Sequence, residues 1–107
     1  MTLLSPSVSP SPIAATGGKS VTLQFNDNLL LPLLLGDHDR HLVRIEQAIG
    51  VRLSCRGNRI AIVGETTRVD AAQGILRSLW RKLEQGESVG RPEVETAIRL
   101  EIGRAHV

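Results

Sequence analysis

The stretch from residue 35 to residue 64 most constrains the fold, because it places three local patterns in a fixed order. A glycine loop comes first, and an amphipathic helix is predicted next, from about Arg40 to Ile49. Its apolar side chains recur at helical spacing, at Leu42, Ile45 and Ile49. Gly50 can end this helix, since glycine readily adopts the left-handed conformation found at helix C-termini. Two short strands are predicted to follow.

These strands, residues 51–56 and 59–63, surround Gly57-Asn58, a dipeptide typical of two-residue hairpin loops. Apolar side chains alternate onto one face, at Val51, Leu53, Cys55, Ile60 and Ile62. Polar side chains share the other face, at Arg52, Ser54, Arg56 and Arg59. In this register Arg56 lies opposite Arg59, and opposed like charges destabilise a hairpin. A bound anion would relieve the repulsion, but two arginines that splay into water explain the pattern equally well.

The residues before this stretch predict one more strand and one short helix. Segment 21–25 alternates apolar and polar residues, as a half-buried strand does. Segment 26–28, Asn-Asp-Asn, can end that strand and cap the leucine-rich helix predicted from 29 to 35. Pro32 fits the first turn of this helix, where its missing N–H costs little.

A long helix is predicted after the hairpin, from about 67 to 85. Thr67 and Asp70 are spaced as in a capping box at its start. Its buried stripe is predicted at Ala72, Ile75, Leu76, Leu79 and Leu83. Trp80 sits beside the stripe, and a short helix is predicted at 92–100. This order of elements predicts an α+β fold, with a three-stranded antiparallel sheet and helices packed on one face.

Composition narrows the class of protein. Residues 1–18 are rich in serine and proline and carry no charged side chain, so we expect a disordered tail. No stretch approaches the ~20 apolar residues of a membrane span, so no membrane partner is expected. The single cysteine cannot form a disulfide within the chain, which favours a cytoplasmic location.

The net charge is only +2, yet residues 40–59 hold five arginines and one acid. Such clustering is typical of nucleic-acid-binding surfaces, although a solvated surface is the simpler explanation of this feature alone.

The glycine loop, Gly36-Asp37-His38-Asp39, precedes a helix whose free N–H groups and dipole favour a phosphate. Asp37 and Asp39 act against a phosphate, because their carboxylates are negative and can cap the same N–H groups. The candidate nucleic-acid-binding residues are Gly36, Asp37, His38, Asp39, Arg40, Arg44, Arg52, Arg56 and Arg59.

This order of elements resembles a KH domain of type I, in which a Gly-x-x-Gly loop clamps about four nucleotides of single-stranded nucleic acid. Here the second glycine is replaced by Asp39. A closer similarity is to the N-terminal region of the PhoH-like, phosphate-starvation-inducible ATPase family. It spans 21–100 and is carried by V-T-L-Q-F-N-D-N-L-L-L-P-L-L-L-G-D-H-D-R-H-L-V-R-I-E-Q-A-I-G-V-R-L-S-C-R-G-N, I-V-G-E and L-E-Q-G-E. The resemblance implies a KH-like accessory domain at 19–86 that binds single-stranded RNA weakly. A linker with a short helix, 87–100, then leads toward an ATPase domain.

The resemblance also implies that the full-length parent binds ATP and Mg, and that its own ATPase domain is a partner in an oligomeric assembly. This chain has no G-x-x-x-x-G-K-[ST] run, and the string at 17–20, Gly-Gly-Lys-Ser, lacks its spacing and leads into a strand. We therefore assign the chain itself no cofactor, no metal and no enzymatic activity. Residues 101–107 resemble the translation of a sequencing-adapter oligonucleotide, so we expect them to be an artefact and the protein to continue past Leu100.

Two other functions stay open. The degenerate loop is compatible with a protein-contact scaffold that helps an ATPase assemble and binds no nucleic acid. A metal or hydrolytic site is the weaker alternative. His38 and His41 lie three residues apart with two carboxylates beside them, and zinc or manganese accepts such ligands. No third well-placed ligand is evident in the sequence.

Overall fold

The computed structural model describes residues 18–105 of the chain. The predicted disordered tail therefore lies outside the described residues, except for Gly18, which begins the first strand. Of the segment expected to be an artefact, residues 101–105 belong to the last helix, and His106 and Val107 are not described.

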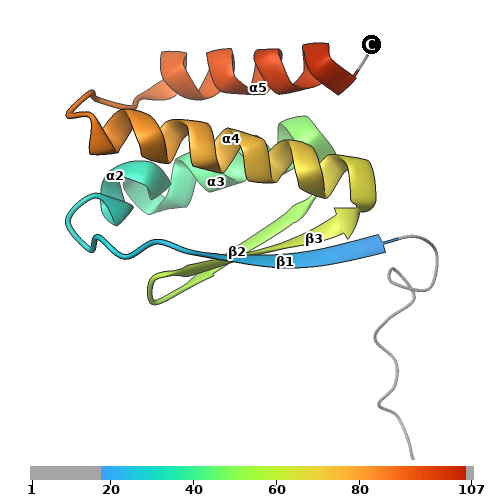
Figure 1. Cartoon of the computed structure of the whole chain (residues 1–107), viewed down its shortest axis with the longest axis horizontal. Coiled ribbons are helices and arrows are strands. Elements are labelled where there is room, and N and C mark those ends of the chain that lie inside the picture. Colours follow the sequence, from blue (N-terminus) through green and yellow to red (C-terminus); the bar gives the residue numbers. More distant parts are fainter. Residues whose placement is uncertain (1–17, 106–107) are drawn as a thin grey trace, which may run out of the picture.

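Three strands form one antiparallel sheet: β1 (Gly18–Gln24), β2 (Arg52–Arg56) and β3 (Arg59–Glu65). The strand order is β1-β3-β2, so β3 is central and β2 is an edge strand. Between β1 and β3, Val21 pairs with Ile62. Between β2 and β3, Arg56 pairs with Arg59, as the two-residue turn requires. All described helices lie on one side of this sheet (Figure 1). The predicted α+β class is confirmed, and the arrangement is consistent with a KH-like fold.

The first helices are short and follow each other closely. Helix α2 (Leu31–Leu35) is followed by a 3₁₀ turn (Asp37–Asp39), helix α3 (Arg40–Ile45) and one π-helical turn (Glu46–Gly50). The side chain of Asp27 accepts hydrogen bonds from the N–H groups at 29 and 30, at 2.9 and 3.3 Å, in the turn that leads into α2. The N-cap position of α2 itself is Leu30, which has no side-chain capping bond, so the predicted side-chain cap is displaced into the preceding turn.

The leucine run divides between core and solvent. Leu31 and Leu34 are buried, whereas Leu33 is 53% exposed and Leu29 is 85% exposed. A five-residue helix spans less than two turns, so it can bury only one side of a sequence that is apolar on all sides. The leucines of this run therefore cannot all face the core, and Leu29 and Leu33 stay at the surface.

The core lies between the sheet and the long helix α4 (Thr66–Glu84). Its largest fully buried side chains come from α2, α3, α4, α5 and the central strand β3: Leu34, Ile45, Ile60, Ile62, Val69, Ile75, Leu76, Leu79 and Val94. The predicted inward stripe of α4 is buried throughout, as are Leu23 and Phe25. Burial of each such side chain contributes about 1.5–3 kcal/mol to folding.

The predicted capping box of α4 is wrong. The helix begins at Thr66, and Glu65 is its N-cap, with its carboxylate accepting a hydrogen bond from the N–H of Arg68 at 3.2 Å. Asp70 instead forms an ion pair with Lys19 of β1 at 2.6 Å. Strand β3 extends to Glu65, two residues beyond its predicted end, and this moves the start of the helix.

Helix α5 (Arg91–Ala105) is longer than the predicted helix at 92–100 and packs against α4 and α3. Its buried residues Val94, Ala97 and Ile98 join the same core as the sheet. Figure 1 shows α5 beyond α4, farthest from the sheet. Within residues 18–105, no helix combines the length and the apolar character that a membrane crossing needs.

Candidate nucleic-acid interface

The glycine loop makes a tight turn between α2 and α3. Gly36 has a φ of 76°, and an added Cβ would lie 2.9 Å from side-chain atoms of both Arg40 and His41. A glycine is therefore required here by backbone conformation and by space. The N–H of Asp39 donates to the carbonyl of Gly36 at 3.2 Å, which closes the turn.

The second glycine of the KH loop is replaced by Asp39, but the backbone still has the left-handed conformation that glycine favours. His38 and Asp39 both adopt left-handed conformations, with φ of 53° and 57°. Side chains other than glycine disfavour this region by roughly 1–2 kcal/mol per residue, although Asp and His adopt it more readily than most. Asp39 therefore keeps the conformation that the missing glycine would have, and adds a carboxylate at that point.

The predicted caps of α3 by Asp37 and Asp39 are wrong. Asp39 occupies the N-cap position, but its side chain forms no capping hydrogen bond, and the carboxylates of both residues are exposed. A left-handed residue points its side chain away from the N–H groups of the first turn, because capping normally uses an extended backbone at this position.

The loop lies near the end of strand β2. The thiol pKa of Cys55 is raised, mainly by burial and also by the negative charge of Asp39. Asp39 thus lies close enough to strand β2 for its charge to act on the Cys55 thiol. Cys55 donates a weak hydrogen bond from Sγ to the carbonyl of Gly57 at 3.6 Å.

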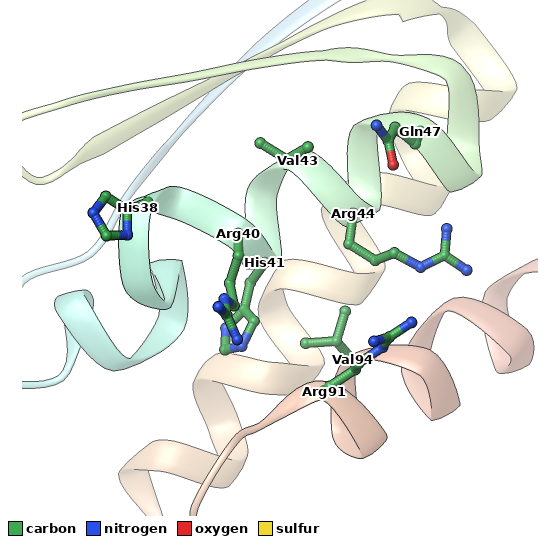
Figure 2. Close-up of a pocket in the computed structure, with 8 residues that line it drawn as sticks. All are labelled: His38, Arg40, His41, Val43, Arg44, Gln47, Arg91 and Val94. Carbon is green, nitrogen blue, oxygen red and sulfur yellow. The ribbon is translucent and has the colours of Figure 1, made fainter.

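A pocket of about 470 Å³ opens between α3 and α5 (Figure 2). Its lining contains no acidic residue and consists of His38, Arg40, His41, Val43, Arg44, Gln47, Arg91 and Val94. Arg40, His41 and Arg44 come from α3, and Arg91 and Val94 come from α5.

Arg44 is already paired inside the protein. Its guanidinium donates to both carboxylate oxygens of Glu95 on α5, with Nη2 to Oε1 at 2.9 Å and a second bond from Nε to Oε2. The hydrogen bonds to Glu95 raise the pKa of Arg44, and the same bonds lower the pKa of Glu95. A phosphate would have to compete with this carboxylate for Arg44.

A second hollow, of about 660 Å³, lies on the sheet face opposite the helices. It is lined by Thr22, Ser54, Arg56, Asn58, Arg59 and Ala61, again without an acid. Arg56 and Arg59 are directly opposed across the hairpin and both are exposed, as the sequence predicts. Arg52 is exposed on the same strand and pairs with Val63, outside this hollow.

The nine candidate residues thus fall on two surfaces. The loop and the α3 arginines lie with the helices, whereas the three hairpin arginines lie on the open face of the sheet. The two hollows share no lining residue. This follows from the strand alternation, which sends the arginines of β2 and β3 away from the helix-covered face.

The sequence did not single out several residues that shape these surfaces. Gln47, Arg91 and Glu95 belong to the α3–α5 pocket or hold its arginine, and His41 was noted only as a metal ligand. Helical phase places Gln47 on the same face as Arg40 and Arg44, but we did not count it among the candidate site residues. Arg91 and Glu95 reach α3 only through the packing of α5, which no local pattern reveals.

One further contact restricts hydrogen bonding at the edge of β2. The carboxylate of Glu46 accepts a hydrogen bond from the N–H of Leu53 at 2.7 Å, so this edge donor is occupied. The buried Phe25 ring contacts Trp80 in a tilted arrangement, with ring centroids 4.7 Å apart and an angle of 52° between planes. Trp80 is partly buried and packs against the edge of the core.

Within residues 18–105 no group of three or more His, Cys, Asp and Glu side chains is arranged to hold a metal ion. The ring of His41 is buried, and its Nδ1 lies 3.0 Å from the carbonyl oxygen of Leu34. His38 is exposed on the loop.

No protein-family model matches this chain.

Proposed function

We propose that this chain is a KH-like accessory domain that binds single-stranded RNA through its phosphate groups. The observation that carries the proposal is the opposed pair Arg56 and Arg59, exposed on an acid-free hollow of the open sheet face. Two guanidinium groups held opposite each other repel, and a polyanion placed between them turns that repulsion into attraction.

The neighbouring side chains support contact with a sugar–phosphate backbone. Thr22, Ser54 and Asn58 add hydroxyl and amide groups to the same hollow, and such groups commonly donate to phosphate and sugar oxygens. The chain has two aromatic residues, and they contact each other: Phe25 is buried in the core and Trp80 is partly buried at its edge. We therefore expect weak binding with little base preference and a strong dependence on salt.

The glycine loop contributes less than its KH-like position implies. Asp37 and Asp39 carry exposed carboxylates, and Arg44 is held by Glu95. The two carboxylates would repel a phosphate bound at the loop. Arg40 follows the loop directly and forms no ion pair among residues 18–105, so it is the arginine that could offset this repulsion. The open sheet face is accordingly the main binding surface in this proposal.

The resemblance to the PhoH-like family supports a further part of the proposal. The chain would serve as the N-terminal accessory region of a cytoplasmic ATP-binding protein and would itself carry no catalytic site. ATP and Mg would then bind to the separate ATPase domain of that parent.

A protein-contact scaffold is the second candidate. Exposed leucines on and before α2, Leu29 and Leu33, and the exposed Leu100 of α5 favour it. Such side chains gain free energy when a partner covers them. Light scattering after size exclusion would show self-association if these residues join copies of the chain.

A salt titration tests RNA binding directly. The affinity for a fluorescent single-stranded RNA of about twelve nucleotides is measured by anisotropy from 50 to 300 mM salt, concentrations chosen as the roughly physiological range over which phosphate contacts are released. The slope of log K against log salt should become less steep by about 0.7 for each arginine removed, so by about 1.4 for R56A/R59A.

The matched control is R81A/R99A, which removes two exposed arginines from α4 and α5 and leaves both hollows described above intact. It should change affinity only slightly. Equal losses in the two double variants would mean that bulk charge alone attracts the RNA. No measurable binding by the unaltered chain at 50 mM salt would leave the scaffold as the better explanation.

A further inference from the structure

We propose that the pocket between α3 and α5 binds a phosphate monoester with a hydroxyl-bearing group, as in a nucleoside monophosphate or the 5′-terminal nucleotide of an RNA. This site is separate from the open sheet face, and the inference does not require that face to bind RNA. It rests on the charge, the enclosed polar atoms and the size of the pocket.

The charges around the pocket match a doubly negative group. Arg40, Arg44 and Arg91 line it, and Glu95 neutralises one of these three positive charges. Arg40 makes no hydrogen bond or ion pair within the described part of the chain. Arg40 and Arg91 come from different helices, so a phosphate between them would receive donors from both sides (Figure 2).

A buried histidine supplies a second, independent feature. His41 lines the pocket and is only 7% exposed. Its Nδ1 must carry a proton, because the Leu34 carbonyl oxygen 3.0 Å away can only accept. In the neutral ring Nε2 is then an acceptor, and no described residue donates to it. A buried acceptor without a donor is unfavourable, and a hydroxyl of the ligand would satisfy it.

The volume and the apolar walls fit such a ligand. The pocket measures about 470 Å³, within the range of roughly 300–1,000 Å³ typical of small-molecule sites. Val43 and Val94 line it together with the polar groups, and so offer apolar surface to a sugar or base. An extended RNA backbone would need a longer open groove, whereas a terminal nucleotide fits a local pocket.

The test uses the whole chain and adenosine 5′-monophosphate, with adenosine and inorganic phosphate as partial ligands. Binding is followed by the NMR shifts of the His41 ring and the Arg91 backbone during titration. The monophosphate should bind, adenosine should bind at least about tenfold more weakly, and R91A should weaken the monophosphate about tenfold. R99A is the matched control, since Arg99 is an exposed arginine of the same helix outside the pocket.

Glu95→Gln tests whether the negative charge beside the pocket opposes phosphate binding. The variant removes a negative charge beside the pocket and releases Arg44, so phosphate affinity should rise about threefold to tenfold. His41→Asn keeps a donor for the Leu34 carbonyl and removes the Nε2 acceptor, so it should weaken the monophosphate but leave inorganic phosphate unchanged. If this variant does not fold, the R91A and R99A comparison still decides.

Two RNA probes distinguish the sources of the phosphate. A tetranucleotide with a 5′-phosphate should bind more tightly than the same RNA with a 5′-hydroxyl, and the difference should vanish in R91A. Preference for the 5′-phosphate without binding of the free nucleotide would support the RNA end as the ligand. If neither the nucleotide nor the 5′-phosphate moves the His41 or Arg91 signals, the inference is overturned, whether or not R56A/R59A alters RNA binding.

Discussion

Glu95 of α5 holds the guanidinium of Arg44 on α3 through two hydrogen bonds, although the two residues are far apart in the sequence. The pair joins the last helix to the helix that follows the glycine loop. It also withdraws one of the candidate RNA-binding arginines from solvent ligands. A helix that the sequence alone assigns to a linker therefore shapes the candidate interface.

Acid should weaken the attachment of α5. The hydrogen bond from Gly90 N–H lowers the pKa of Glu93, and the bonds from Arg44 lower the pKa of Glu95. A carboxyl group whose pKa is lower in the folded state stabilises the protein above its unfolded-state pKa, and this stabilisation is lost as pH falls through the folded-state value. The melting temperature should therefore fall between about pH 5 and pH 2.

The variants E93Q and E95Q should melt below the unaltered protein at pH 7 and should show a flatter decline in acid. Glu84→Gln is the control, because Glu84 is exposed and has no hydrogen bond or ion pair among residues 18–105. Thermal unfolding followed by circular dichroism from pH 7 to pH 3 measures the slopes. Identical slopes for E95Q and E84Q would show that the Arg44 pair adds no stability.

Two adjacent leucines should differ sharply when truncated. Leu34→Ala removes a side chain with no exposed surface and should lower the free energy of unfolding by about 2–5 kcal/mol. Leu33→Ala removes a side chain that is 53% exposed and should change it by less than about 0.5 kcal/mol. Urea denaturation measures both. A cost above about 2 kcal/mol for Leu33→Ala would place that side chain in a contact absent from this fold.

Asp39→Gly should increase RNA affinity without loss of stability. The residue already has the left-handed backbone that glycine prefers, so the substitution relieves strain of about 1 kcal/mol, offset by the greater freedom of glycine in the unfolded chain. It also removes a negative charge from the loop. Asp39→Asn is the matched variant, since it removes the charge and keeps Cβ. Filter binding of both variants separates the two causes, and an affinity no higher than that of the unaltered chain would exclude the loop from the interface.

The opposed arginines should carry a cost in stability that a threonine removes. Arg59→Thr should raise the free energy of unfolding by about 0.2–1 kcal/mol, because it removes a like-charge pair and adds a residue suited to strands. Arg52→Thr is the control, since Arg52 pairs with Val63 and faces no like charge. Chemical denaturation at low salt compares them, and equal gains in both variants would show that Arg56 and Arg59 do not repel measurably.

The local elements followed from the sequence wherever a pattern repeats within a few residues. The two-residue turn fixed the register that opposes Arg56 and Arg59, and helical spacing identified the buried stripes of α3 and α4. The caps were harder to predict. Thr67 has the right spacing for a capping box, but β3 runs on to Glu65 and the helix starts one residue earlier than Thr67.

The sequence alone determined the class of fold, the register of the hairpin and which face of the hairpin carries the arginines, because hydrogen-bond geometry and side-chain alternation are set by neighbours along the chain. Only the tertiary structure decided which leucines of α2 are buried, that α5 closes the pocket beside α3, and that Arg44 is paired with Glu95. Those outcomes depend on contacts and ion pairs between segments that are far apart in the sequence, and such contacts form only when the chain packs into its tertiary structure.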